Sequence, residues 1–186
     1  MKTEELNDSS ASIEEIATNS DIILVVGPEK RKLQVNSCVL KNASKVFNAM
    51  FGPHFREGQD LHGNYPKEIP MLDDNADALT IICRILHLRN DSISDSLTPN
   101  EVLQIAIAAD KFDCVMRLKA HTAKWLNSGN MQDILELGRL SVASYILDNA
   151  WAFGQLTYAM IFRSRDSYIP LASEFSDYIP QKTFCM

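Results

Sequence analysis

The sequence predicts an α+β fold, in which a small three-stranded sheet is flanked by helices and followed by a helical carboxyl-terminal extension. Two observations predict this order of elements. Near the amino terminus a β-branched run is followed by an alternating return strand, whereas apolar residues after Asn36 recur at helical spacing. From Thr98 onward, where a capping box opens a helix, only helical patterns follow.

The expected strands stand early in the chain. Residues 22–26 are β-branched and apolar, the composition of a buried strand, and residues 33–35 form its return strand. Residues 27–32 contain Gly-Pro and Lys-Arg-Lys, which predicts a hairpin turn with a solvated basic tip rather than a nuclear signal or an anion site. A third strand is expected at residues 69–72, where Pro70 restricts it to a sheet edge or a strand end.

Short helices are expected after the hairpin. Asn36 or Ser37 can cap the first and Ser44 the second, because their side-chain oxygens accept hydrogen bonds from N–H groups of the first turn. A longer helix over residues 76–88, with caps available at 73–75, is apolar on nearly all sides. That pattern predicts a helix in the middle of the domain.

The carboxyl half is predicted to be helical throughout. Residues 98–101, Thr-Pro-Asn-Glu, combine a capping box with proline at the first helical position. The helix that they open is interrupted at Phe112 and then continues to residues 128–130. Two further helices are expected, one over 132–147 in which Gly138 permits a break, and one over 149–163 behind an Asp148 cap.

Four segments result from this division of the chain. Residues 1–19 are expected to form a flexible polar arm, with at most one helical turn at 12–16. The other three are the domain at 20–127, the helical extension at 128–165 and the tail at 166–186.

The tail repeats Tyr-Ile-Pro at 168–170 and 178–180. The two copies either pack on the parent domain, which the apolar residues Leu171, Phe175 and Phe184 favour, or act as linear motifs for a bivalent partner.

Charge and apolar run length exclude several classes of protein. The net charge of −6 argues against nucleic acid as the main partner, because a phosphate backbone favours a cationic face. No apolar run approaches the roughly 20 residues needed to span a bilayer. The acidic amino terminus lacks the apolar region of a secretory signal. We therefore expect a protein of the cytoplasm, the nucleus or both.

Motifs for catalysis or metal binding are missing from the sequence. The cysteines are too far apart for a zinc or redox pair, so reduced, buried thiols are expected. His54 and His62 share one loop but lack further ligands at a regular interval, and His87 and His121 occupy apolar helical positions typical of core histidines. Phosphate-binding glycine loops and a serine nucleophile elbow are also missing. We predict no enzyme, no cofactor and no metal.

The order of elements resembles the BTB/POZ domain over residues 20–127. Residues 85–90 and 108–114 resemble the branch of that family common in filamentous fungi. Phe55-Arg56-Glu57-Gly58 is similar to the family's Phe-x-Glu segment. The remaining resemblance is carried by residues 20–27, 33–40 and 44–51.

The resemblance implies a protein-interaction module. The family's best-known partner, a cullin scaffold of ubiquitin ligases, docks near the loop after the central helix and near the helix after Phe112. In this chain residues 88–90 replace the Tyr-x-Gly that animal members carry in that loop. Leu88 and Phe112 could also fill the core. The implied protein-binding surface comprises Phe55, Leu88, Arg89, Asn90, Ile93, Phe112 and Asp113.

Two functions remain open at this point. One is an adaptor for a cullin-type ubiquitin ligase. The other is a self-associating scaffold in transcriptional regulation, which would reach DNA only through a partner because the chain carries no DNA-reading motif. Family members that form exchanged dimers carry an extra amino-terminal helix and strand, and the first twenty residues supply little of either, so at most a weak homodimer is expected.

Overall fold

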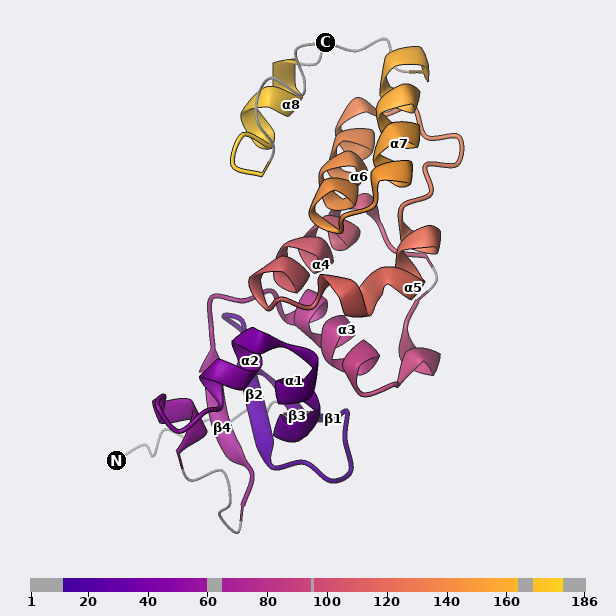
Figure 1. The fold of residues 1–186 in the computed structure, drawn as a ribbon. Coiled ribbons are helices and arrows are strands. Elements are labelled where there is room, and N and C mark those ends of the chain that lie inside the picture. The colour runs from indigo at the N-terminus through magenta and orange to yellow at the C-terminus, as the bar shows by residue number, and fades with distance from the viewer. Residues whose placement is uncertain (1–11, 60–64, 95, 164–168, 179–186) are drawn as a thin grey trace, which may run out of the picture.

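The computed structural model describes residues 12–59, 65–94, 96–163 and 169–178. The described chain runs from a small sheet at one end to a group of helices at the other (Figure 1). Helices α1 and α2 lie beside the sheet, α3, α4 and α5 occupy the middle, and α6 and α7 form the far end. The α+β prediction is confirmed.

The sheet has four strands in the order β1-β3-β2-β4. Strands β2 (Ile22–Val26) and β3 (Arg31–Val35) form the predicted antiparallel hairpin. Strand β4 (Lys67–Met71) runs parallel to β2 at one edge. Pro70 therefore lies on an edge strand, as predicted, where its missing N–H interrupts no interior ladder.

Strand β1 (Ile13–Glu15) corrects the prediction of three strands. It pairs in parallel with β3, and just beyond it the N–H groups of Ile16 and Ala17 donate to the Gln34 carbonyl at 3.0 and 3.2 Å. The side chain of Ile16 is buried in the core. Within residues 12–16 the chain thus forms a strand rather than a helical turn, because pairing with a distant segment outweighs a weak local preference.

The three helices nearest the sheet begin at predicted caps. The side-chain oxygens of Asn36, Ser44 and Asn75 each accept a hydrogen bond from a first-turn N–H. The central helix buries Leu79, Ile82 and Ile85, whereas Ile81 and Leu86 are only partly buried. It ends two residues earlier than expected. The elements are α1 (Ser37–Ala43), α2 (Lys45–Met50), α3 (Ala76–Leu86) and two 3₁₀ turns, η1 (Arg56–Gly58) and η2 (Asn90–Ser92).

Helix α4 (Pro99–Lys111) carries the predicted capping box. The Thr98 hydroxyl accepts from the Glu101 N–H at 3.2 Å, and the Glu101 carboxylate accepts from the Thr98 N–H at 2.7 Å. The interruption at Phe112 is also confirmed. The backbone turns there, and α5 (Val115–Trp125) follows.

Helix α6 (Ile134–Ile146) is unbroken, so the break that Gly138 permitted does not occur. Helix α7 (Ala150–Arg163) begins after Asn149, whose side-chain oxygen accepts from the Ala152 N–H at 3.0 Å. Asp148, the predicted cap, instead occupies a left-handed turn with φ of 51°. The prediction missed the cap by one residue.

Part of the tail packs on the extension. Helix α8 (Ile169–Glu174) places Leu171 and the following Phe175 in the core, and both side chains are buried. Tyr178 is partly exposed. Residues 168 and 179–180 of the two Tyr-Ile-Pro copies, together with Phe184, lie outside the described residues. The tail therefore packs through Leu171 and Phe175, whereas Pro170 and Tyr178, the described side chains of the two copies, are exposed.

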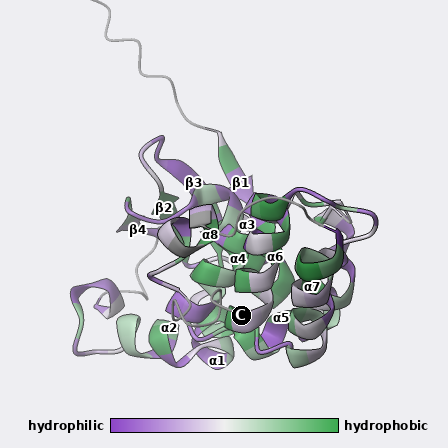
Figure 2. Ribbon diagram, turned by 90° about the horizontal axis from the view of Figure 1, so that it is seen from above, coloured by the Kyte–Doolittle hydropathy of each residue, from purple (hydrophilic) through white to green (hydrophobic). Residues whose placement is uncertain are grey.

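A single apolar core joins the sheet to the extension. It includes Leu24 of β2, Ile82 of α3, Leu137 of α6 and Leu156 of α7. Figure 2 shows apolar residues gathered where α3, α4 and α6 overlap, with polar residues on the surrounding turns. No helix in the described ranges is long and apolar enough to cross a membrane.

Candidate functional site

The loop after α3 presents the most exposed apolar residue of the predicted surface. Leu88 is 82% exposed, and its backbone has φ of 60°, a left-handed conformation that is uncommon for leucine. The conformation closes the end of α3, because the Arg89 N–H donates back to the Arg84 carbonyl at 2.8 Å. The loop therefore holds a large apolar side chain out in solvent.

Two arginines tie this loop to strand β1. The Arg84 guanidinium donates to the Glu14 carboxylate at 2.8 and 3.1 Å and to the Ser92 carbonyl at 2.8 Å. Arg89 donates to the Ile16 carbonyl at 3.3 Å. Because both contacts reach across more than 60 residues of sequence, β1 and the loop stabilise each other.

His87 anchors the other side of the loop. Its Nε2 accepts from the Asn36 N–H at 3.1 Å, so its Nδ1 carries the proton and donates to the Cys83 carbonyl at 2.8 Å. Burial lowers the pKa of His87 below the ordinary value of 6.5. This neutral imidazole joins the start of α1 to the end of α3, which confirms the expected structural role of His87.

The turn between α4 and α5 holds two more of the predicted residues. Phe112 is only 3% exposed and stacks on Phe47 with ring centroids 4.7 Å apart. Its carbonyl accepts from the Ser44 hydroxyl, the same hydroxyl that caps α2. Asp113 is exposed with φ of 49°, and its carboxylate lies 4.0 Å from the Lys45 ammonium. Phe112 therefore packs inside the domain and supports the surface from within.

Phe55 lies after the carboxyl end of α2 and is 52% exposed. Lys67 stabilises this loop by donating to the Arg56 carbonyl at 2.7 Å and to the Gln59 carbonyl at 2.5 Å. Asp113 contacts the opposite, amino-terminal end of α2 through Lys45. The two residues are thus separated by the length of that helix.

The structure divides the seven predicted residues among separate places. One group, Leu88, Arg89, Asn90 and Ile93, lies on the loop beside β1, with the first three exposed and Ile93 packed partly against the core. Asp113 and Phe55 lie at the two ends of α2, and Phe112 is internal. We refer to Leu88, Arg89, Asn90 and Ile93 as the α3 loop surface.

The sequence interpretation missed an exposed apolar face on α7. Trp151, Tyr158, Ile161 and Phe162 are 76%, 56%, 56% and 68% exposed. A signal for it was present, because Trp151, Tyr158 and Phe162 recur at i, i+7 and i+11, while Ala152, Leu156 and Ala159 form a second stripe. A helix that packs on a core through one face needs only one apolar stripe, so α7 carries a second stripe that the core does not use.

Thiols and acidic clusters show no arrangement for catalysis in the described residues. Cys83 and Cys114 are buried, and burial raises the pKa of both, that of Cys114 to about 11, which disfavours the reactive thiolate. Cys38 is exposed, which corrects the expectation that it is buried, and Cys185 lies outside the described residues. No group of three or more His, Cys, Asp or Glu among the described residues could hold a metal.

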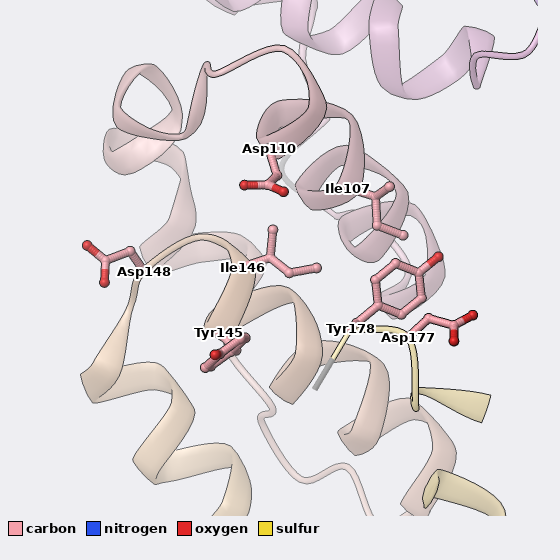
Figure 3. Close-up of a pocket in the computed structure, with 7 residues that line it drawn as sticks. All are labelled: Ile107, Asp110, Tyr145, Ile146, Asp148, Asp177 and Tyr178. Atoms are coloured by element: carbon pink, nitrogen blue, oxygen red, sulfur yellow. The ribbon is translucent and has the colours of Figure 1, made fainter. Parts of the chain in front are cut away.

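One hollow does contain three carboxylates. It opens between α4, the end of α6 and the turn after α8, and Figure 3 shows the carboxylates spread around it rather than converging. Because the carboxylates do not converge on one point, the hollow is an acidic surface recess. Its lining residues are Ile107, Asp110, Tyr145, Ile146, Asp148, Asp177 and Tyr178.

A comparison with protein-family models matches residues 12–130 to the model described as BTB/POZ domain. The chain belongs to the BTB/POZ family. The BTB/POZ match begins just before β1, so it takes in the strand that the sequence interpretation assigned to the arm. BTB/POZ domains mediate protein–protein interactions, and this chain is therefore an interaction module. A comparison with curated proteins found no match.

Proposed function

We propose that this BTB/POZ chain is a non-catalytic adaptor that binds a cullin-type scaffold of a ubiquitin ligase through the α3 loop surface. The observation that supports the proposal is Leu88, an 82% exposed leucine on a loop that Arg84, His87 and Arg89 fix to two other elements. A side chain presented on an already ordered loop loses little conformational entropy when it binds, which favours its use as an anchor.

The polar neighbours of Leu88 fit a rim around such an anchor. Arg89 and Asn90 are exposed beside it, and Ile93 supports the loop from below. Interfaces commonly surround a buried apolar anchor with polar side chains that keep hydrogen bonds to the partner or to water. Phe55 and Asp113 lie at the two ends of α2, away from the α3 loop surface, and in this proposal they contact only the edge of the partner.

The test is a binding titration between the full chain and a cullin amino-terminal domain. Leu88→Asp should weaken binding by at least tenfold, because it places a charge in the centre of the contact. Leu72→Asp is the matched control: Leu72 is also an exposed leucine, but it follows β4 at the opposite edge of the sheet. Equal affinity of the wild type and Leu88→Asp would remove this surface. No binding of the wild type at about 100 µM, which corresponds to a binding free energy weaker than about −5.5 kcal/mol, would remove the adaptor function.

A second candidate function is a self-associating scaffold in transcriptional regulation. The observation that favours it is the exposed apolar face of α7, which an isolated monomer leaves in solvent. Chromatin-associated partners would co-purify with the full chain in this case, and a cullin would not.

We also propose, from residues 85–90 and 108–114, that the chain falls in the branch of the family common in filamentous fungi.

A further inference from the structure

The exposed face of α7 is the largest cluster of solvent-facing apolar side chains on a single helix of the described chain. Its members are Trp151, Tyr158, Ile161 and Phe162, which we call the α7 stripe, and each is more than half exposed. Tyr158 and Phe162 contact each other, with ring centroids 4.3 Å apart. Figures 1 and 2 place α7 at the outer side of the helical end of the molecule, and Figure 2 shows its apolar colouring there.

The stripe is separate from the face that α7 buries. Ala152, Leu156 and Ala159 point into the core beside α6, so the helix is already packed on its inner side. No charged residue occurs from Trp151 to Phe162. An ordinary solvent-facing helix surface carries charges, so this composition indicates that the stripe is covered by protein.

Gly154 lies within the stripe, one helical turn from Trp151 and one from Tyr158. A Cβ built on Gly154 would meet nothing within 4 Å, so no packing inside the described chain requires glycine here. Glycine in a helix interior is unfavourable, and close approach of another backbone or ring is a common reason for it. The stripe therefore has a hollow between two large aromatic side chains.

The area of the stripe fits a partner of the size of this chain. A fully buried aromatic side chain removes about 150–250 Å² from water, so the three rings and Ile161 offer roughly 400–500 Å². A stable interface buries about 800 Å² on each partner, of which a little over half is apolar. The stripe with its polar margin supplies that amount.

We infer that the α7 stripe is a homodimer interface, in which α7 packs antiparallel against α7 of a second copy. A twofold axis that crosses the exposed face of α7 at the level of residue 156 places Trp151 against Ile161 of the second copy and the Tyr158 ring over its Gly154. Large side chains then face smaller ones, and each hollow is filled. Parallel pairing would instead place glycine against glycine and leave the hollow empty.

A twofold arrangement also explains why the chain needs no second complementary surface. The same stripe serves both copies, and the interface closes on itself without leaving a free end. Antiparallel helices place opposite ends of their dipoles together, which is favourable, and the uncharged stripe brings no like charges into contact despite the net charge of −6.

Sedimentation velocity of the full chain from 1 to 200 µM tests the interface. We expect a monomer–dimer equilibrium, with Trp151→Glu and Ile161→Lys each weakening dimerisation by at least tenfold. Met116→Glu is the control, because Met116 is 69% exposed on α5 and lies outside the stripe. A monomer throughout this range would overturn the inference, as would a dimer that neither stripe variant weakens.

The double variant Trp151→Glu/Ile161→Lys tests the antiparallel register. It brings the new glutamate of each copy against the new lysine of the other, so it should dimerise more tightly than either single variant. Gly154→Ala should also weaken the dimer by at least tenfold while the circular dichroism of the helices is retained. Failure of the double variant to recover, or a tight dimer with alanine at 154, would overturn this register.

The inference does not rest on cullin binding. Leu88→Asp should leave dimerisation unchanged, and Trp151→Glu should leave the binding of a cullin domain unchanged. Loss of both activities in both variants would instead indicate that the two surfaces are one, which contradicts the assignment of α7 to self-association.

Discussion

The family-matched region and the helical extension treat their large apolar residues differently. In residues 12–130 the exposed examples are scattered singly over different elements, as Leu72, Leu88 and Met116 show. In the extension, four gather on one helix. Scattered exposure is normal for a folded domain, whereas a gathered patch marks a contact. The comparison teaches that the family-matched region buries its large apolar side chains apart from isolated ones, while the extension exposes a continuous apolar surface that its core does not use.

The same difference is visible between the two helices of the extension. Gly138 of α6 is covered, because a Cβ there would lie 2.5 Å from Leu171 Cδ2 and 3.0 Å from a Phe175 ring carbon. Gly154 of α7 faces open space. One glycine makes room for the chain's own tail, and the other has no neighbour among the described residues. The predictions below separate the two regions by experiment.

The largest effect is expected from Phe47→Ala in the family-matched region. Phe47 is fully buried and stacks on both Phe51 and Phe112. Its truncation should cost about 3–5 kcal/mol of unfolding free energy, since it removes apolar contacts and leaves a cavity. Urea denaturation at low protein concentration measures this loss.

Phe162→Ala is the matched control for Phe47→Ala. Phe162 is 68% exposed on α7, so the same substitution should change the stability of the monomer by less than about 0.5 kcal/mol. Equal losses for the two variants would contradict the division between a closed core and an open stripe.

The next effect is expected from Gly138→Ala, which should release α8 from α6. The added methyl displaces Leu171 and Phe175, and overpacking of this kind costs about 1–3 kcal/mol, partly offset by about 0.5–1 kcal/mol of improved helix propensity in α6. Hydrogen exchange should therefore speed up in residues 169–178 but not in α6. Gly154→Ala is the matched control. The added methyl there meets no other group, so only the gain in helix propensity applies and the unfolding free energy of the monomer should rise.

Local patterns in the sequence predicted what depends on neighbours a few residues away. The capping box of Thr98 and Glu101 and the cap at Ser44 need only a few consecutive residues, and both occur as predicted. Strand β1 could not be predicted in this way, because its stability comes from β3 and from Arg84, which are distant in sequence. Gly138 resembled a helix break for the same reason, since the tail residues that require it follow more than thirty positions later.

The candidate surface shows a similar division. The exposure of Leu88 and the burial of Phe112 were both open from the sequence, because each sits in an apolar pattern at a helix end. Their different outcomes depend on which way the backbone turns after the helix. Leu88 itself adopts the left-handed conformation, whereas Asp113 takes it after Phe112 and leaves the ring inside. Such a one-residue difference in turn position is set by packing rather than by composition.

A smaller effect is expected from Arg84→Met, which tests how β1 is held to the family-matched region. Loss of the partly buried contact to Glu14 should cost about 1 kcal/mol and speed up hydrogen exchange at Ile16 and Ala17. Lys32→Met is the control, because the Lys32–Glu68 ion pair is more exposed and should contribute less than about 0.5 kcal/mol. A larger effect from Lys32→Met would contradict the assigned role of Arg84.

The smallest effect is a pH dependence that belongs to the family-matched region alone. Burial lowers the pKa of His87 in the folded chain below 6.5, so the folded state resists protonation more than the unfolded state. The stability that neutral His87 contributes is therefore complete above pH 6.5 and is lost as the pH falls from there toward the lower folded pKa. Protonation of Nε2 would also break the hydrogen bond from the Asn36 N–H, because Nε2 would then carry a hydrogen and could no longer accept.

His87→Gln makes this contribution measurable, because glutamine does not titrate and carboxylates elsewhere affect both proteins equally. The wild type should be the more stable of the two at pH 7.5, and urea denaturation should show this advantage shrinking toward pH 5. An advantage that stays constant or grows as the pH falls would contradict the neutral imidazole. Dimerisation through α7 should not follow the same profile, because the stripe from Trp151 to Phe162 contains no histidine or acidic side chain.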